Sequence, residues 1–532
     1  MYTFSNSLRT FAFILMAVGI LGVGYSFFTA PTSLEEVEQI LAAEHHGGHG
    51  EAAHHEGPAE KAHEHQTEEK HTQNAGAPEP TKETTLVEHS SAESAHAEGK
   101  DTIESPAMHS GADAQTSVQS EEHDAASPTG DAQSAPAHED HVGHSEIAGE
   151  AHKKHDAHDE HAEHKEHAEH VFKQLQNKPW SALYVAALFF TLLSLGVLAF
   201  YAIQNAAQAG WSPVLFRVME GITSYLIPGA VVVFVLLALG VFRVHNIFIW
   251  MDPDVVAEDH LIQQKSGYLD GTFFLIRAVI FFGGWIFYRQ YARKQSLAQD
   301  EATDNLSYKR SFKAAAGFLV FFIVSESIMS WDWIMSVDPH WYSTLFGWYV
   351  FASFFVSGIT TIALVTVYLK SKGYLEYVNT SHIHDLAKFM FGISVFWTYL
   401  WFSQFMLMWY ADMPEEVVYF KMRIDNYNLP FFGMVVMNFV FPILILINTD
   451  FKRLSWIIVM AGVVILLGHY IDFFNMIMPA TVGDRWFIGA GEVGSVLFFL
   501  GLFIFVVFTA LTKVPLLAKR NPLIEESKHF HY

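Results

Sequence analysis

The chain has 532 residues, 51% of them hydrophobic and 15% aromatic, yet its formal net charge is −24. A chain this apolar and this acidic forms a folded body only if its charges are segregated along the sequence. It contains no cysteine, which excludes disulfides, thiolate-ligated iron–sulfur clusters and covalent attachment of c-type haem.

The first predicted element is a transmembrane helix over residues 8–28, within an N-terminal segment 1–30. A basic residue followed by an apolar run is also typical of a cleaved signal peptide. The run is long for such a peptide, however, and the sequence from Phe27 to Pro31 is a poor cleavage site. We therefore predict that this helix is retained.

The second segment, residues 31–170, holds 32 of the 56 acidic residues, 7 of the 32 basic residues and 22 of the 30 histidines. It has few apolar side chains to offset the entropy of ordering, so we predict disorder. In its last part histidine recurs at every third position from His152 to His170 among Ala, Glu and Lys, which favours a helix leading into the next span. These histidines suit weak binding of zinc, copper or nickel, or, more simply, a solvated proton-buffering linker.

Nine further apolar runs are long enough to cross a bilayer, which takes about 20 residues. They lie at residues 181–203, 222–244, 269–289, 312–336, 342–369, 384–411, 428–449, 454–477 and 490–512. The sequence thus predicts an all-α integral membrane protein with about ten transmembrane helices.

The loops between these spans alternate in charge. Those after the fourth, sixth and eighth spans are basic, as is the C-terminal tail, whereas loops 252–259 and 412–416 carry mostly acids. Because basic loops stay in the cytoplasm, we predict a multi-pass protein of the bacterial inner membrane with both termini cytoplasmic. The acidic segment would then lie outside, in the periplasm.

Titratable residues inside apolar spans are energetically costly and therefore indicate function. The candidates for a proton path are Glu326, Asp332, Asp338 and His340 on or after the fifth span, His469 and Asp472 on the ninth, and Asp270 and Arg277 on the fourth. His469 and Asp472 are three residues apart and share one helix face. Asp270 and Arg277 are two turns apart on one face, so they could instead form a structural pair.

Other polar residues in the spans have simpler explanations. Gln404 and Asn438 suit hydrogen bonds between helices, and Glu492 suits the start of a helix as well as a functional role. With the predicted orientation, the titratable groups fall in the middle or outer half of the membrane. The inner half offers mainly neutral groups such as Thr360 and Thr361, which favours a half-channel over a complete pump.

Two motifs resemble a known family. The run from Ser325 to Thr344 (SESIMSWDWIMSVDPHWYST) and the run from Gly468 to Asp472 (GHYID) are similar to the NrfD/polysulfide-reductase family of membrane subunits, in particular those of bacterial alternative complex III. The resemblance covers nearly all of residues 171–515. It implies two four-helix bundles, residues 171–336 and 337–480, flanked by the first span and by a last span within 481–532.

The resemblance also implies a function. Family members bind menaquinol or ubiquinol near the outer face, and their complex passes electrons to cytochrome c or to an oxidase. The implied partners are a homologous quinol-binding membrane subunit, an iron–sulfur/molybdopterin-like subunit and cytochrome c subunits, with haem and iron–sulfur clusters on those partners and none intrinsic to this chain. Membrane lipid surrounds the chain, and no nucleic acid is involved.

One departure from the family pattern bears on this role. In the quinol-oxidising sister subunit a histidine stands six residues before the aspartate that matches Asp332, whereas here that position is Glu326. This favours a proton-conducting, complex-building subunit that is not catalytic alone, with quinol binding secondary.

Two other functions stay open. A secondary transporter fits ten spans, charges near the midplane and an interruption such as Pro228-Gly229. The histidine-rich segment would suit metal ions, although a metal site needs three or four ligands together. A purely structural anchor for extrinsic redox subunits would tolerate neutral replacement of the buried acids.

Overall fold

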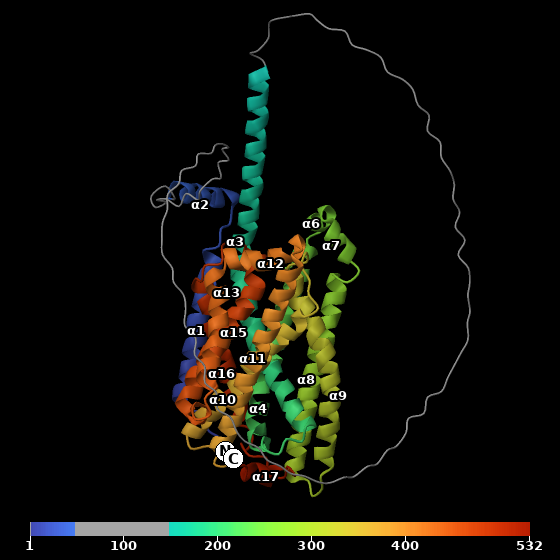
Figure 1. The fold of residues 1–532 in the computed structure, drawn as a ribbon, viewed down its shortest axis with the longest axis vertical. Coiled ribbons are helices and arrows are strands. Elements are labelled where there is room, and N and C mark those ends of the chain that lie inside the picture. Colours follow the sequence, from blue (N-terminus) through green and yellow to red (C-terminus); the bar gives the residue numbers. More distant parts are fainter. Residues whose placement is uncertain (1, 48–147, 532) are drawn as a thin grey trace, which may run out of the picture. The chain divides into compact units, whose positions relative to one another are not determined.

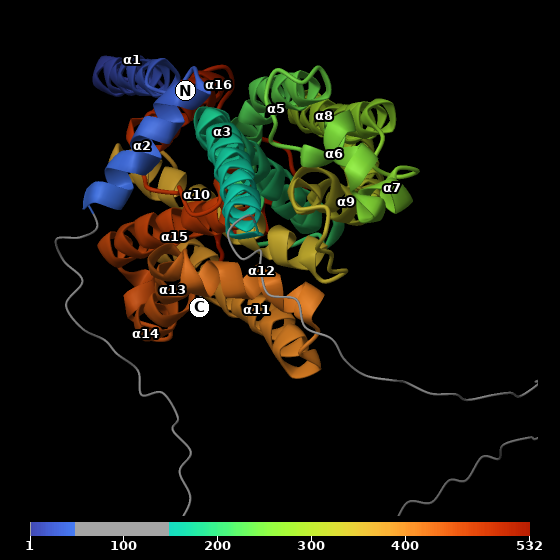
Figure 2. The same cartoon turned by 90° about the horizontal axis from the view of Figure 1, so that it is seen from above.

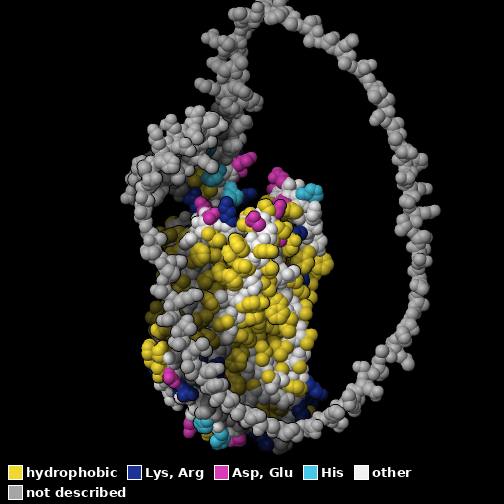
Figure 3. Space-filling model, in the orientation of Figure 1, with side chains coloured by type: hydrophobic (Ala, Val, Ile, Leu, Met, Phe, Trp, Pro, Cys, Tyr) yellow, Lys and Arg dark blue, Asp and Glu magenta, His cyan; other side chains and the backbone are white. Residues whose placement is uncertain are grey.

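The computed structural model describes residues 2–47 and 148–531, with the backbone alone for 44–47 and 148–163. In this part of the chain the regular structure is helical, and ten helices are long and apolar enough to cross a membrane. The prediction of an all-α, multi-pass membrane protein is therefore confirmed. Apolar side chains cover the body between two charged ends (Figure 3).

The ten spans follow the predicted order (Figure 1). They are α1 (Asn6–Phe28), α3 (Ala148–Ala206), α4 with α5 (Phe216–Ile222, Leu226–Val241), α8 (Gly271–Glu301), α9 (Leu306–Trp333), α10 (Phe346–Ser371), α11 (Thr380–Ala411), α13 with α14 (Asn428–Val435, Phe441–Leu446), α15 (Ser455–Val482) and α16 (Ala490–Leu511). The shorter helices are α2 (Leu34–Gly47), α6 (Pro253–Glu258), α7 (His260–Lys265), α12 (Pro414–Asp425) and α17 (Ile524–Lys528).

Several helices extend beyond the apolar runs, because backbone hydrogen bonding continues wherever the sequence tolerates it. Helix α3 begins at Ala148, as its Ala, Glu and Lys content predicts. Disorder was expected for residues 31–170, but α2 and the start of α3 are helical, and 48–147 lie outside the described residues. The acidic loop near residue 412 is followed by α12, whose Pro414 sits in the first turn, where its missing N–H costs nothing.

The spans form two groups of four, with α1 and α16 paired beside them (Figure 2). One group contains α3, α5, α8 and α9, and the other contains α10, α11, α13–α14 and α15. Helices α3 and α10 lie at the junction. A Cβ on Gly196 would come within 2.5 Å of the Phe354 carbonyl oxygen, so glycine is what lets these two backbones approach.

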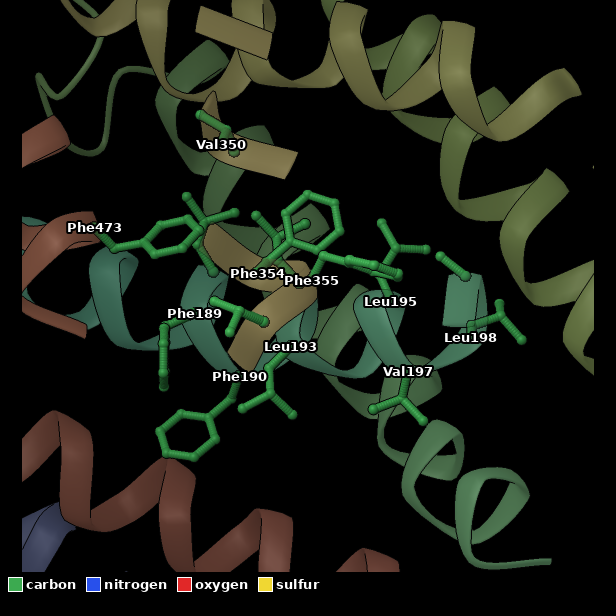
Figure 4. Packing of buried hydrophobic residues seen from close by; sticks show 14 of the residues in the cluster. Phe189, Phe190, Leu193, Leu195, Val197, Leu198, Val350, Phe354, Phe355 and Phe473 are labelled. Carbon is green, nitrogen blue, oxygen red and sulfur yellow. The ribbon is translucent and has the colours of Figure 1, made fainter. Parts of the chain in front are cut away.

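Aromatic and branched side chains fill the junction between α3, α10 and α15 (Figure 4). Phe189 of α3 meets Phe473 of α15 with ring centroids 5.9 Å apart. Phe200 of α3 meets Phe355 of α10 at 6.0 Å. The junction is thus a packed apolar core that holds the two groups together.

Helices α1 and α16 pack through glycine. A Cβ on Gly19 would lie 2.4 Å from the Phe498 nitrogen, and one on Gly494 would lie 2.8 Å from the Val23 nitrogen. Close backbone approach of this kind is how helices associate in lipid, where burial of apolar surface gives no driving force.

Both termini lie at the same end of the helices (Figure 1). Thr3 Oγ1 lies 3.1 Å from the hydroxyl of Tyr374. Residues 518–530, here called the C-terminal strap, cross this end. Ser527 donates to the carbonyl of Trp211 (2.6 Å), and its own carbonyl lies 3.0 Å from His382 Nε2. The strap therefore contacts both groups of helices.

Candidate functional site: two buried polar clusters

The second group of helices encloses a polar cluster around Asp472 and His469, both of which are fully buried on α15. Asp472 Oδ2 accepts a hydrogen bond from the Trp397 indole of α11 (2.8 Å), and Oδ1 accepts one from the Tyr349 hydroxyl of α10. His469 Nδ1 lies 3.0 Å from Ser353 Oγ and 3.6 Å from Asp472 Oδ2. The structure thus brings together the two residues that their spacing predicts as neighbours.

Among the described residues, no lysine or arginine side chain forms an ion pair with Asp472. Among the residues that the structure describes, its one ion-pair neighbour is His469, and that separation is longer than a hydrogen bond. Its two donors, Tyr349 and Trp397, are neutral. Asp472 is therefore a buried carboxyl group held by neutral donors beside an imidazole.

Asn438 completes the cluster from the eighth span. It lies in a π-helical turn, Val436–Val440, a local irregularity that is common at functional sites. Its Nδ2 is 3.4 Å from His469 Nδ1, while Asn438 Oδ1 and His469 Nε2 are buried without a hydrogen-bond partner. Gly468 provides the space, since a Cβ there would lie 2.1 Å from Asn438 Oδ1. These two unpaired atoms are suitable sites for water.

A small cavity lies beside Tyr349, between α12 and the helices of the second group. Tyr349 lines it together with Tyr419, Arg423, Gln404 and Asn475, and its volume of about 10 Å³ is close to what one water molecule needs. The Arg423 guanidinium is 3.3 Å from the ring centroid of Tyr419 and donates to the Asn475 carbonyl (3.0 Å). Gln404, predicted as a hydrogen-bond partner between helices, has its amide nitrogen buried and unpaired.

The first group of helices holds a different cluster, centred on Asp332 at the end of α9. Its Oδ2 accepts from Arg277 Nε of α8 (2.5 Å), and its Oδ1 accepts from the Tyr268 hydroxyl (2.6 Å). The Arg277 guanidinium also lies 4.3 Å from the centre of the Tyr268 ring. Asp332 is fully buried, whereas the Arg277 side chain is 17% exposed. One carboxylate oxygen is therefore in an ion pair with Arg277, and the other accepts a hydrogen bond from the Tyr268 hydroxyl.

The expected pair between Asp270 and Arg277 does not form. Asp270 is the N-cap of α8 and accepts a hydrogen bond from the backbone N–H of Phe273 (2.9 Å), while Arg277 turns to Asp332. A capping carboxylate satisfies an amide that would otherwise lack a partner. Asp270 is exposed and stands apart from the buried cluster.

Glu326 lies six residues before Asp332 on α9 and is buried. Its Oε2 accepts from the neighbouring Ser327 hydroxyl (3.2 Å), and its Oε1 has no hydrogen-bond partner. Among the described residues no cation pairs with it. Glu326 is therefore, like Asp472, a buried carboxyl group that accepts hydrogen bonds from neutral donors.

Asp338 and His340 lie beyond α9, at the surface. His340 Nε2 is 2.5 Å from Asp259 Oδ2 and its Nδ1 is 3.9 Å from Asp338 Oδ1. The hydrogen bond from His340 holds the pKa of the Asp259 carboxyl below its ordinary value. Lys265 adds a second link, donating to the Pro339 carbonyl (2.5 Å). This part of the chain ties α7 to the end of α9.

A third charged cluster lies at the end where the termini meet, and the sequence analysis missed it. Arg217 pairs with Glu220 (2.8 Å) and with Asp300 (2.5 Å), and Arg293 approaches Glu220 at 3.3 Å. The third span was predicted to begin at residue 222, but helical structure starts at Pro213, so Arg217 and Glu220 were counted in a loop. Arg217 and Glu220 are buried and stand in addition to the charged residues named from the sequence.

Glu492 is a helix cap, one of the two roles expected for it. Its Oε2 accepts from the backbone N–H of Gly489 (2.8 Å) at the start of α16. Within residues 2–43 and 164–531, whose side chains the structure describes, no group of three or more His, Asp or Glu side chains is arranged to hold a metal ion. No protein-family model and no curated protein matches the chain.

Proposed function

We propose that this chain is a membrane subunit of a quinol:electron-acceptor oxidoreductase complex of the alternative complex III type, in the position of its ActF subunit. In this role it contributes a proton path and a scaffold beside the quinol-oxidising subunit. The complex lies in the bacterial inner membrane, with both termini of this chain in the cytoplasm.

The observation that carries the proposal is the environment of Asp472. Quinol oxidation releases protons, and these need groups that can accept and pass them. Asp472, His469 and the Tyr349 hydroxyl stand in series, and the Tyr349 cavity has room for about one water. Groups of this kind in a membrane span are costly and are typical of proton relays.

Asp332 and Asp472, two of the buried carboxylates in the predicted path, have different surroundings, and we assign them different roles. Asp332 is bound by Arg277 and Tyr268 on both oxygens and acts as a structural link between α8 and α9. Asp472 is held by neutral donors and acts as the relay group, with Glu326 as a second titrating carboxyl. Each aspartate lies on the last helix of its group and each accepts a tyrosine hydroxyl, which is what two related bundles would show.

The test is made on the intact complex. Asp472→Asn keeps the shape and the acceptor oxygen Oδ1 but replaces Oδ2 by an amide nitrogen and cannot ionise, so coupled proton release should fall at least tenfold while the complex still assembles. Proton release would be followed with a pH indicator in proteoliposomes during quinol oxidation. Asp270→Asn is the matched control, because asparagine caps a helix as well as aspartate does.

Unchanged proton release in Asp472→Asn would refute the relay. The broader assignment has its own test, which is purification of the chain from its native membrane. Co-purification of multihaem cytochrome and iron–sulfur subunits supports the proposal, whereas a chain that purifies alone and moves metal ions into vesicles would make it a transporter.

A further inference from the structure

A polar cavity of about 540 Å³ lies between α1, α3 and the segment after α5, at the end opposite the termini. Its cationic lining residues are Lys173 of α3 and Arg243, and amide side chains of Gln176 and Asn177 stand beside them. None of the residues that line it is acidic. The cavity is therefore suited to an anion.

Hydrogen bonds hold several of the residues that line the cavity in place. Asn177 Nδ2 donates to the carbonyl of Asn246 (2.9 Å), and the backbone N–H of Asn246 donates to Asn177 Oδ1 (3.0 Å). His245 is fixed by a contact of 2.9 Å from its Nε2 to the Leu236 carbonyl, and burial lowers its pKa. Neutral His245 leaves Lys173 and Arg243 as the cations.

Neither cation has a carboxylate partner among the side chains of residues 2–43 and 164–531. The side chains of Lys173 and Arg243 are both exposed. Glu36, close in sequence to the cavity wall, accepts a hydrogen bond from the Thr32 backbone N–H (2.8 Å) near the start of α2. Two cations thus share one cavity whose described lining contains no carboxylate.

Arg243 also occupies an unfavourable backbone conformation. Its φ is 59°, just after the end of α5, in the left-handed region where helices usually place glycine. A side chain costs about 1 kcal/mol or more there. Strain of this kind at a cavity wall points to a role for the side chain.

We propose that this cavity binds the phosphate headgroup of an anionic phospholipid. The cations and amides would hold the phosphodiester, and the acyl chains would lie along the apolar surface beside the cavity. That surface is present: Phe28 is 87% exposed and Phe242 is 73% exposed. Both lie at helix ends, where the headgroup region of a bilayer meets its hydrocarbon core.

The position of α1 argues for lipid over a soluble anion. Helix α1 contacts the rest of the protein mainly through α16 and exposes most of its surface. The Phe27 ring at its end packs on Trp180 of α3 with centroids 4.8 Å apart. A lipid headgroup in the cavity would therefore contact both α1, at the periphery, and α3, at the centre of the protein. This inference does not depend on the proposed redox function.

The test measures lipid retention. The full chain would be purified in mild detergent, delipidated, and titrated with phosphatidylglycerol, phosphatidylcholine or inorganic phosphate, with binding read by native mass spectrometry and by the melting temperature. We expect phosphatidylglycerol to bind and stabilise, and the other two to do neither. Each cation near a lipid phosphate contributes about fivefold in affinity. The double variant Lys173→Gln with Arg243→Gly should therefore bind phosphatidylglycerol about 25-fold more weakly than the native chain.

The Arg243→Gly variant distinguishes a loss of lipid binding from a loss of folding stability. Glycine adopts a φ of 59° without strain, so this variant should fold at least as well as the native chain while binding phosphatidylglycerol about fivefold more weakly. Lys294→Gln, a cation outside the cavity, is the control and should bind normally. Native-like affinity in Arg243→Gly with Lys173→Gln would overturn the site, and equal stabilisation by inorganic phosphate would overturn the lipid assignment.

Discussion

Replacing Arg277 with methionine would leave the Asp332 carboxylate buried without its cation. Removing one member of a buried ion pair costs about 3–5 kcal/mol, because the remaining charge is left uncompensated. Asp332 is fully buried, but Arg277 is 17% exposed and Tyr268 keeps its hydrogen bond. We therefore expect the low end of this range, about 3 kcal/mol.

The assay is unfolding of the purified chain in mixed micelles with increasing denaturing detergent. Adding Asp332→Asn to Arg277→Met removes the stranded charge, so the double variant should recover a large part of the lost free energy of unfolding. Asp270→Asn should change it by only a few tenths of a kcal/mol, since asparagine preserves the cap. The reasoning fails if Arg277→Met is no more harmful than Asp270→Asn, or if the second substitution restores nothing.

Two further predictions concern other parts of the molecule. Gly468→Ala should destabilise the chain by about 2 kcal/mol and impair proton release, because its Cβ would lie 2.1 Å from Asn438 Oδ1. Gly433→Ala is the control: a Cβ there meets open space, so this variant should fold normally. Thermal unfolding of the two variants compares them directly. The lowered pKa of Asp259 means that its link to His340 stabilises the protein above about pH 4 and that this contribution is lost as pH falls through the lowered value. The native chain should thus lose more thermal stability between pH 6 and pH 3 than His340→Gln does, and parallel pH profiles would contradict this.

The order and number of the spans could be predicted from the sequence because apolar length alone decides what crosses a bilayer. The hydrogen-bond and ion-pair partners that a residue finds on other helices could not be predicted in this way. The spacing of His469 and Asp472 on one helix predicted their proximity, but nothing local indicated that Tyr349 and Trp397 would hold the carboxylate. Sequence spacing was misleading for Arg277, whose partner Asp332 is brought to it by the packing of α8 against α9.

Helix ends were the second source of error. Hydropathy locates the apolar centre of a helix but not its first turns, so a charged pair at the start of the third span was assigned to a loop. Amphipathic helices at the surface, such as α2 and α12, lack the apolar length that marks a span and were read as loop or disordered sequence.

The C-terminal strap has a consequence for how the protein is made. Ser527 donates to Trp211 in one group of helices, and its carbonyl lies against His382 in the other. Both contacts come from residues that follow α16, the last described span, so during synthesis from the N-terminus they form after all ten described spans have been made. A chain truncated before residue 518 would keep these ten spans and lose both contacts.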